Sequence, residues 1–209
     1  MSIGVYRESW IRPVILEGEL VRLVPLRAEH AAELWKVGQH TDIWRWMPWI
    51  MEAQSDFETQ VANLLAWAET NFGQSYVIEL LDRSGIVGST SYLNADRANR
   101  RVEIGATRIT PAWQRTGVNT ECKLLLMRHA FEELEANRVE FKTDSMNMRS
   151  RAAIARIGAR EEGTLRNHMV RPDGSLRHST YFGVTVEEWP RVQEHMRRLL
   201  RAYDTPLPA

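Results

Sequence analysis

The stretch Thr110–Glu121 carries the residues whose types and spacing point most directly to chemistry. It joins an expected strand to the most helix-like segment of the chain through a tight turn that contains Gly117. Such a junction leaves the first N–H groups of the helix without intrahelical acceptors and places the positive end of the helix dipole behind them. These groups suit a pyrophosphate. The alternative is structural: Gly117 shapes the turn, and Asn119 or Thr120 caps the helix.

Other nucleotide-binding and metal-binding signatures find no support in the sequence. The pattern G-x-x-x-x-G-K-[ST] does not occur, and Gly85 and Gly88 lack the third glycine and the following helix of a dinucleotide fingerprint. Cys122 is the single cysteine, and the 6 histidines stand at no ligand spacing. We therefore expect no metal cofactor.

The elements that must position this stretch follow an order that excludes pure parallel winding. Apolar periodicity predicts helices over Ala28–Gln39, Ala53–Phe72, Gly117–Ala136, Met148–Ile157 and Thr185 to about Tyr203. Alternation and turn signals, among them a hairpin turn at Asp82–Gly85, predict strands over Glu19–Leu26, Tyr76–Leu81, Ile86–Leu93, Arg101–Ile109, Val139–Thr143, Arg160–Met169 and Arg177–Val184. Because consecutive hairpins require antiparallel pairs, the predicted fold class is α/β (α+β), a mixed sheet with helices on both faces.

Length and composition indicate a single globular domain over residues 1–203 with a short tail at 204–209. The chain of 209 residues suits one core, and 44% hydrophobic with 26% charged residues excludes a disordered class. Basic and acidic residues both number 27, so no global charge attracts nucleic acid or an anionic membrane. No apolar run approaches the roughly 20 residues that span a bilayer. A lone cysteine and the lack of a signal segment favour the cytoplasm.

Four short motifs follow one another along the chain in an order typical of one known superfamily. They are Val102–Ala106 on a strand, Gln114–Asn119 at the start of a helix, Asn147 with Ser150, and Arg156–Ala159. On these motifs the chain resembles the GNAT superfamily of N-acetyltransferases, and within it the RimJ/RimL-like branch. The resemblance covers nearly the whole chain, from Glu17 to Arg198. It implies a mostly antiparallel sheet of about seven strands whose central parallel strands splay apart.

The resemblance also implies acetyl-coenzyme A (acetyl-CoA) as co-substrate. The family's Q/R-x-x-G-x-G/A loop binds the pyrophosphate through backbone N–H groups, and it matches Gln114, Arg115, Thr116, Gly117, Val118 and Asn119, with Thr120 next in the helix. Asn119 departs from the pattern by replacing the second small residue, although Asn tolerates left-handed geometry and adds a donor. The pantetheine arm would lie between the strands Arg101–Ile109 and Val139–Thr143, bonded by the backbone near Arg108 and Ile109. Asn147 matches the family position that hydrogen-bonds this arm.

Acetyl transfer to an amine needs a neutral amine, a stabilised carbonyl oxygen and a proton for the thiolate. Glu103 matches the carboxylate that the family often places near the splay, so it is the candidate base or amine anchor. The alternative is a strand carboxylate paired with a neighbouring Arg. Many relatives supply the proton from a Tyr, but Met148–Ile157 contains none, and Ser150 is the candidate acid there. Ser150 is equally suited to cap the helix, and a thiolate leaves readily without an acid.

The acceptor pocket is predicted from aromatic and polar residues. Trp44, Trp46 and Trp49 lie between the first two long helices, where family members build this pocket, and Glu79 and Tyr92 on the hairpin are further candidates. Core packing is the alternative for these side chains. The expected partner is a primary amine, on a protein N-terminus or a small molecule. Dimers are frequent among relatives, and the sequence leaves the oligomeric state open.

Two functions compete for this sequence. The first is an acetyl-CoA-dependent N-acetyltransferase in which the acceptor amine attacks directly in a ternary complex. The second is a non-catalytic coenzyme A-binding sensor, or an interaction module, with the same fold. The missing Tyr and the departure at Asn119 keep the second open. Turnover with a panel of amines separates them.

Overall fold

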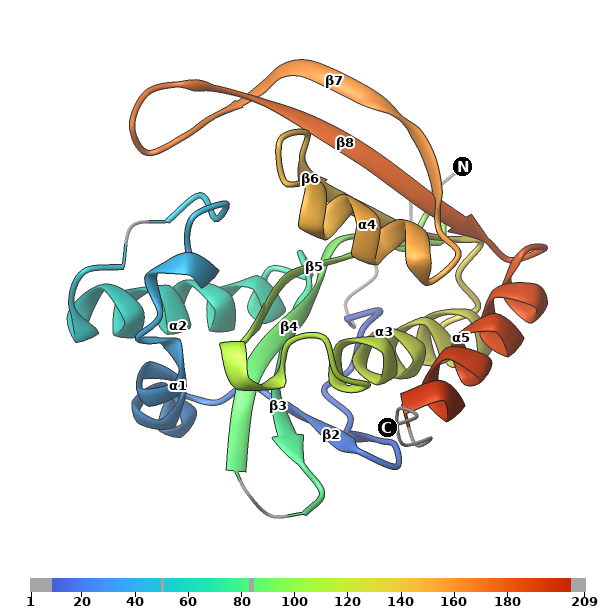
Figure 1. The fold of residues 1–209 in the computed structure, drawn as a ribbon, viewed down its shortest axis with the longest axis horizontal. Helices are drawn as coiled ribbons and strands as arrows, with labels where there is room; N and C mark the ends of the chain where they lie inside the picture. Colours follow the sequence, from blue (N-terminus) through green and yellow to red (C-terminus); the bar gives the residue numbers. More distant parts are fainter. Residues whose placement is uncertain (1–8, 50, 83–84, 204–209) are drawn as a thin grey trace, which may run out of the picture.

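The described strands form one twisted mixed sheet with helices on both faces (Figure 1). The computed structural model describes residues 9–49, 51–82 and 85–203. The 8 strands, in the order β1-β2-β3-β4-β5-β6-β8-β7, are β1 Leu16–Glu17, β2 Val21–Pro25, β3 Gln74–Leu80, β4 Gly85–Asp96, β5 Arg101–Ile109, β6 Arg138–Asp144, β7 Arg160–Val170 and β8 Leu176–Thr185. The predicted tail, 204–209, and two residues of the predicted hairpin turn, 83–84, lie outside the described residues.

Two hydrophobic clusters lie on opposite faces of this sheet. The helices are α1 Ala31–Gly38, α2 Gln54–Glu69, α3 Val118–Arg128, α4 Met148–Arg156 and α5 Trp189–Tyr203, with short 3-10 turns at Ala28–His30, Thr41–Ile43 and Pro111–Trp113. Successive β3 residues alternate between the clusters: Ile78 packs with α3, α4 and α5, and Val77 packs with α1 and α2. None of the helices in the described part of the chain is long and apolar enough to cross a membrane.

The parallel pair β5–β6 is the place where the sheet opens. Its register runs through Arg101↔Arg138, Val102↔Val139 and Glu103↔Glu140 and then stops, although both strands continue. Just beyond the last pair, Ala106 has a φ of 48°, and the β4–β5 register shifts nearby. A bulge of this kind bends a strand away from its neighbour. The predicted splay of the central parallel strands is therefore present and begins after Glu103.

Three details differ from the sequence expectation, each for a local reason. The sheet has 8 strands rather than about seven, because the two-residue strand β1 is too short to show alternation. The helix expected over Gly117–Ala136 changes at His129 into a π-helical segment that ends at Glu133. The last helix begins at Trp189, after a turn in which the Thr185 N–H donates to Glu188 Oε2 at 3.1 Å.

Candidate active site

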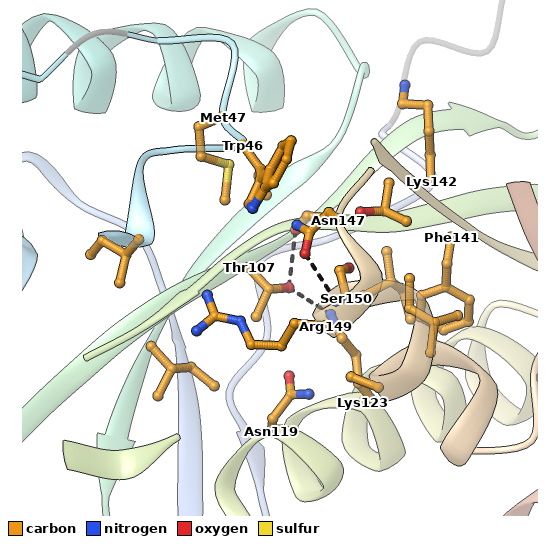
Figure 2. A pocket seen from close by; sticks show the side chains of 18 of the residues that line it. Trp46, Met47, Thr107, Asn119, Lys123, Phe141, Lys142, Asn147, Arg149 and Ser150 are labelled. Carbon is orange, nitrogen blue, oxygen red and sulfur yellow. Dashed lines mark hydrogen bonds between the residues drawn. The ribbon is translucent and has the colours of Figure 1, made fainter. Parts of the chain in front are cut away.

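A cavity of about 740 Å³ occupies the opening between β5 and β6. Its lining runs from Gln114, Arg115, Thr116 and Asn119 in the loop before α3, past Gly105, Ala106 and Thr107 on β5 and Asn147 and Ser150 at α4, to Glu103, Trp46 and Trp49. Figure 2 shows labelled side chains of this set, which are Trp46, Thr107, Asn119, Asn147 and Ser150, around one space that they reach from the loop after α1, from β5, from α3 and from the start of α4. One continuous site thus joins the predicted pyrophosphate loop to the predicted catalytic carboxylate.

The loop before α3 presents backbone donors to this cavity. Among the described residues, the N–H groups of residues 115–117, 119 and 120 have no hydrogen-bond acceptor. The Val118 N–H donates to Thr116 Oγ1 at 3.3 Å, and Thr116 Oγ1 itself donates to the Trp113 carbonyl at 2.8 Å. The left-handed residue is Arg115, with a φ of 62°, whereas the expectation considered Asn119, which lies in the helix. Free amides at the start of an 11-residue helix suit an anion.

Gly117 is required for packing rather than for backbone conformation. Its φ of −62° is open to any residue. A Cβ at this position would lie 2.6 Å from Leu20 Cδ1 and 3.5 Å from Leu200 Cδ2, so the glycine lets α3 approach the β1–β2 turn and α5. Crowding at Gly117 would therefore press on Leu20 and not directly on a ligand in the cavity.

The next residues anchor α3 and do not line the cavity. Val118 is buried in the core, and buried Thr120 accepts a hydrogen bond from Arg156 Nη2 at 2.9 Å. Glu121 is also buried, and its carboxylate accepts three backbone N–H bonds of 2.7–2.9 Å from residues 19–21. Of the predicted loop set, Gly117, Val118 and Thr120 thus contribute through their main chain and their packing.

Lys123 lies at the floor of the opening and was not predicted from the sequence. Its Nζ donates to Thr107 Oγ1 on β5 at 2.5 Å and lies 5.8 Å from the centre of the Phe141 ring on β6. The ammonium therefore stands between the two diverging strands (Figure 2). Burial lowers the pKa of Lys123 to about 8. Within an otherwise ordinary amphipathic helix, nothing in the sequence marks this lysine as buried.

Asn147 and Ser150 occupy the first turn of α4. The Ser150 N–H donates to Asn147 Oδ1 at 3.0 Å, so Asn147 is the N-cap of this helix. The capping role uses the Oδ1 atom, so the Nδ2 group is the part of the amide suited to a ligand. Both residues line the cavity. Arg149 donates to Gln114 Oε1 at 3.0 Å and so ties α4 to the loop before α3.

Glu103 is a buried carboxylate at the last paired position of β5 and β6. Asn94 Nδ2 donates to its Oε2 at 2.8 Å, and Lys142 Nζ lies 3.4 Å from the same oxygen. Only 2% of the residue is exposed. The alternative from the sequence is an ion pair between Glu103 and a neighbouring Arg. The structure shows an ion pair, but its cation is Lys142 on β6. Glu103 therefore lies between the cavity and the Lys142 ammonium, a position compatible with the predicted role as an anchor for the acceptor amine.

Arg108 does not face the cavity. Its buried guanidinium donates to Gln60 Oε1 at 2.5 Å and to Ser89 Oγ at 2.8 and 3.1 Å on the opposite face of the sheet, and it stacks 4.9 Å above the Trp44 ring. Burial lowers the pKa of this guanidinium to about 10. Arg108 and Ile109 pair with Ser89 and Gly88 of β4. Ile109 still lines the cavity, but the bulge at Ala106 brings residues 105–107 to it in place of Arg108.

Three predicted acceptor residues also lie outside this cavity. Trp44 is buried in the cluster of α1 and α2, where its Nε1–H donates to the Gly38 carbonyl at 2.7 Å. Glu79 pairs with Arg22 at 2.7 Å on the sheet. Tyr92 is fully buried, and its hydroxyl donates to the Leu126 carbonyl. Glu79 and Tyr92 thus follow the pairing and core-packing alternatives. Trp44 packs in the core and also lines a smaller neighbouring cavity, whereas Trp46 and Trp49 line the larger one.

The β7–β8 hairpin borders a second cavity with charged residues that the sequence did not single out. This second cavity, of about 310 Å³, lies beside the first, and Trp46, Trp49 and Arg177 line both. Asp144 and Arg171 also line the second cavity, and they form an ion pair of 2.8 Å. Over the described ranges, no group of three or more His, Cys, Asp or Glu side chains is placed to hold a metal ion.

The fold and the site thus combine a mixed sheet that opens at its parallel pair with free backbone amides at the start of the adjacent helix. The chain belongs to the GNAT acetyltransferase family: the sequence model described as the acetyltransferase (GNAT) domain matches residues 21–160. The predicted family and its RimJ/RimL-like branch are confirmed. The family uses acetyl-CoA.

Individual relatives agree with this assignment. The chain is 31% identical over 169 residues to YdaF of Bacillus subtilis (strain 168), whose name proposes a ribosomal N-acetyltransferase; the match covers 80% of this chain and 90% of that protein. A GCN5-related N-acetyltransferase from Brucella melitensis has a TM-score of 0.84 and 28% identity, covering 91% of this chain and 86% of its own. Mycobacterium smegmatis RimJ in complex with CoA-disulfide has a TM-score of 0.77 and 26% identity, and the match covers 90% of this chain and 95% of the RimJ chain.

Proposed function

We propose that the protein is an acetyl-CoA-dependent N-acetyltransferase that acetylates a primary amine by direct attack in a ternary complex. The observation that carries the proposal is the continuous cavity from the free loop amides to Glu103. Its donors fit a phosphate-bearing thioester. The free amides of residues 115, 116 and 119 suit the pyrophosphate, and Asn147 with residues 105–107 suits the amide-bearing arm. When bound, acetyl-CoA supplies an acetyl group activated as a thioester.

In this proposal Glu103 holds the acceptor amine and takes its proton. An α-amine has a pKa of about 8, so a single carboxylate suffices to favour the neutral nucleophile near neutral pH. Asn94 and Lys142 fix the Glu103 side chain by their contacts of 2.8 and 3.4 Å. Ser150, which also lines the cavity, is placed to return a proton to a departing thiolate.

Direct attack is favoured over a cysteine-bound intermediate by the state of Cys122. This residue is the single cysteine of the chain, and it is fully buried on the core side of α3. Burial raises the pKa of its thiol to about 12, so the nucleophilic thiolate is scarce at neutral pH.

For the acceptor, we propose the α-amine of a protein N-terminus, on the strength of the name of YdaF, which refers to a ribosomal N-acetyltransferase. The alternative acceptor is a small-molecule amine. The β7–β8 hairpin and the segment with Trp46 and Trp49 flank the acceptor end of the cavity.

The test is thiol release from acetyl-CoA with a panel of peptides and small amines, followed by mass spectrometry of the products. We expect a mass gain of one acetyl group on an acceptor amine and initial-rate lines that intersect, as a ternary complex requires. Coenzyme A binding without turnover on any amine would instead support a non-catalytic sensor. Parallel initial-rate lines, or an acetylated enzyme isolated without acceptor, would contradict direct attack.

A further inference from the structure

Arg177 carries a buried guanidinium that is incompletely hydrogen-bonded. It lies on β8, 8% of the residue is exposed, and its buried Nε has no hydrogen-bond partner among the described residues. Its side chain lines both the larger cavity and the smaller one beside it. A guanidinium has five N–H donors and stays charged, so leaving it buried without an acceptor is costly unless a ligand supplies one.

The nearest carboxylate does not satisfy Arg177. Asp144 Oδ2 lies 3.9 Å from Arg177 Nε, beyond hydrogen-bond reach, while Arg171 donates to the same oxygen from Nε and Nη2 at 3.0 and 2.8 Å. Around the smaller cavity the charged side chains are Arg45, Arg171 and Arg177 against Asp144 and Asp173. Positive side chains therefore outnumber negative ones around the smaller cavity, and Arg177 is the one of them that also lines the larger cavity.

Arg177 is also close to the proposed reaction centre. It shares the larger cavity with Glu103. Burial lowers the pKa of Arg177, and the negative charges of Asp144 and, to a smaller extent, Glu103 oppose this lowering. The apolar side chains of Trp46, Met47 and Met169 line the space around the guanidinium. An amine at Glu103 and an anionic group at Arg177 would thus belong to one small segment of an acceptor.

We propose that Arg177 binds a carboxylate of the acceptor, which defines the acceptor class as a primary amine bearing a carboxylate a few bonds away. A planar guanidinium matches a carboxylate with two parallel hydrogen bonds, and exclusion of water strengthens them. Two sources supply this chemistry: a free amino acid, or a peptide whose N-terminal segment carries an acidic side chain. The inference rests on the proposed acetyl transfer, of which it specifies the acceptor.

The experiment compares acceptors matched except for one charge. Serine is paired with serinamide, and a peptide beginning Ser-Glu with one beginning Ser-Gln. We expect the native enzyme to prefer the carboxylate member of one pair by about tenfold or more in kcat/KM, and the pair that shows the preference identifies the source. Arg177→Gln should raise KM for that acceptor to the value of its amide partner and leave kcat and coenzyme A affinity unchanged. Arg177→Lys should restore part of the preference.

Controls separate recognition from folding. Arg166→Gln, an exposed arginine on the same hairpin, should change neither KM nor melting temperature. Because the one ion pair of Arg177 within the described part of the chain is the long contact of 3.9 Å with Asp144, Arg177→Gln should not lower the melting temperature, whereas loss of an arginine with a purely structural role would lower it. Equal use of both members of each pair by the native enzyme, or an equal loss on both in Arg177→Gln, would overturn the inference.

A failure of acetyl transfer itself would be recognised separately. If no amine is acetylated, calorimetric titration of the same acceptor pairs in the presence of coenzyme A still tests the site. Binding that depends on the carboxylate and is lost in Arg177→Gln would support it. Binding that ignores the carboxylate, or no binding of either member, would refute it.

Discussion

The Glu103 carboxylate and the Lys142 ammonium lie 3.4 Å apart across the point where β5 and β6 separate. Each residue belongs to one of the two parallel strands, so the ion pair spans the mouth of the opening between them. The ion pair thereby fixes the Glu103 carboxylate at the end of the cavity. Four predictions test this site and the contacts that hold it in place.

Replacing Glu103 by Gln should remove the proton acceptor while keeping the shape of the side chain. We expect kcat to fall by about 100-fold or more, the usual size of a lost general base, with little change in coenzyme A affinity. Steady-state kinetics and calorimetry measure the two effects. Glu140→Gln is the matched control, because Glu140 is the register partner of Glu103 but pairs with Arg138 and Arg101. Full activity in Glu103→Gln would remove Glu103 from the mechanism.

Enlarging Gly117 should act through Leu20. A Cβ at this position would lie 2.6 Å from Leu20 Cδ1, so Gly117→Val should destabilise the protein by about 1–3 kcal/mol and weaken coenzyme A binding by shifting the start of α3. Leu20→Ala makes room, and the double variant should recover a large part of both losses. Additive losses in this cycle, measured by thermal unfolding and calorimetry, would show that Leu20 is not the contact that matters.

Lys123→Met should stabilise the protein while weakening coenzyme A binding. Burial lowers the pKa of Lys123 from 10.5 to about 8, so at pH 7 the folded state carries a charge that burial disfavours. The free energy of unfolding of the variant should then exceed that of the native protein by on the order of 1–3 kcal/mol at pH 7. Because the variant lacks the Lys123 ammonium as a hydrogen-bond donor between β5 and β6, its affinity for coenzyme A should be about tenfold lower.

The pH dependence of the free energy of unfolding tests the direction of the pKa shift of Lys123. Between about pH 8 and 10.5 the unfolded chain binds more protons at Lys123 than the folded chain, so this group adds stability as the pH rises. The stability gap between Lys123→Met and native protein should therefore close over that range. Lys36→Met, at an exposed position on α1, should have the same stability as the native protein at both ends of this pH range. A gap that stays constant to pH 10.5 would contradict the lowered pKa.

Glu121→Gln should loosen α3 from the first strands. The carboxylate accepts three backbone N–H bonds, and a glutamine offers one oxygen and places an N–H₂ group against the remaining donors. We expect a loss of roughly 2–4 kcal/mol in the free energy of unfolding and weaker coenzyme A binding, since the loop before α3 shifts with the helix. Glu69→Gln, exposed at the end of α2, is the control. An unchanged melting temperature for Glu121→Gln would show that the turn does not depend on this carboxylate.

The sequence predicted the elements with strong periodicity and clear end signals. The strand Arg101–Ile109 matches its predicted bounds, and α4 lies within the predicted Met148–Ile157. The free amides before α3 also agree with the expected turn. In contrast, β1 has too few residues to show a pattern, and the π-helical change at His129 depends on hydrogen bonds that no local residue signals.

The sequence by itself determined the family, the order of strands and helices, and the loop that faces the cavity, because periodicity, glycine positions and motif spacing are local properties of the chain. Only the tertiary structure decided which side chains share the cavity. The bulge at Ala106 brings residues 105–107 to the opening and turns Arg108 to the other face. Lys123 and Arg177 stand out because both are buried and neither donates a hydrogen bond to a carboxylate in the described part of the chain. Burial depends on segments that are distant in the sequence, so no single stretch of the chain reveals it.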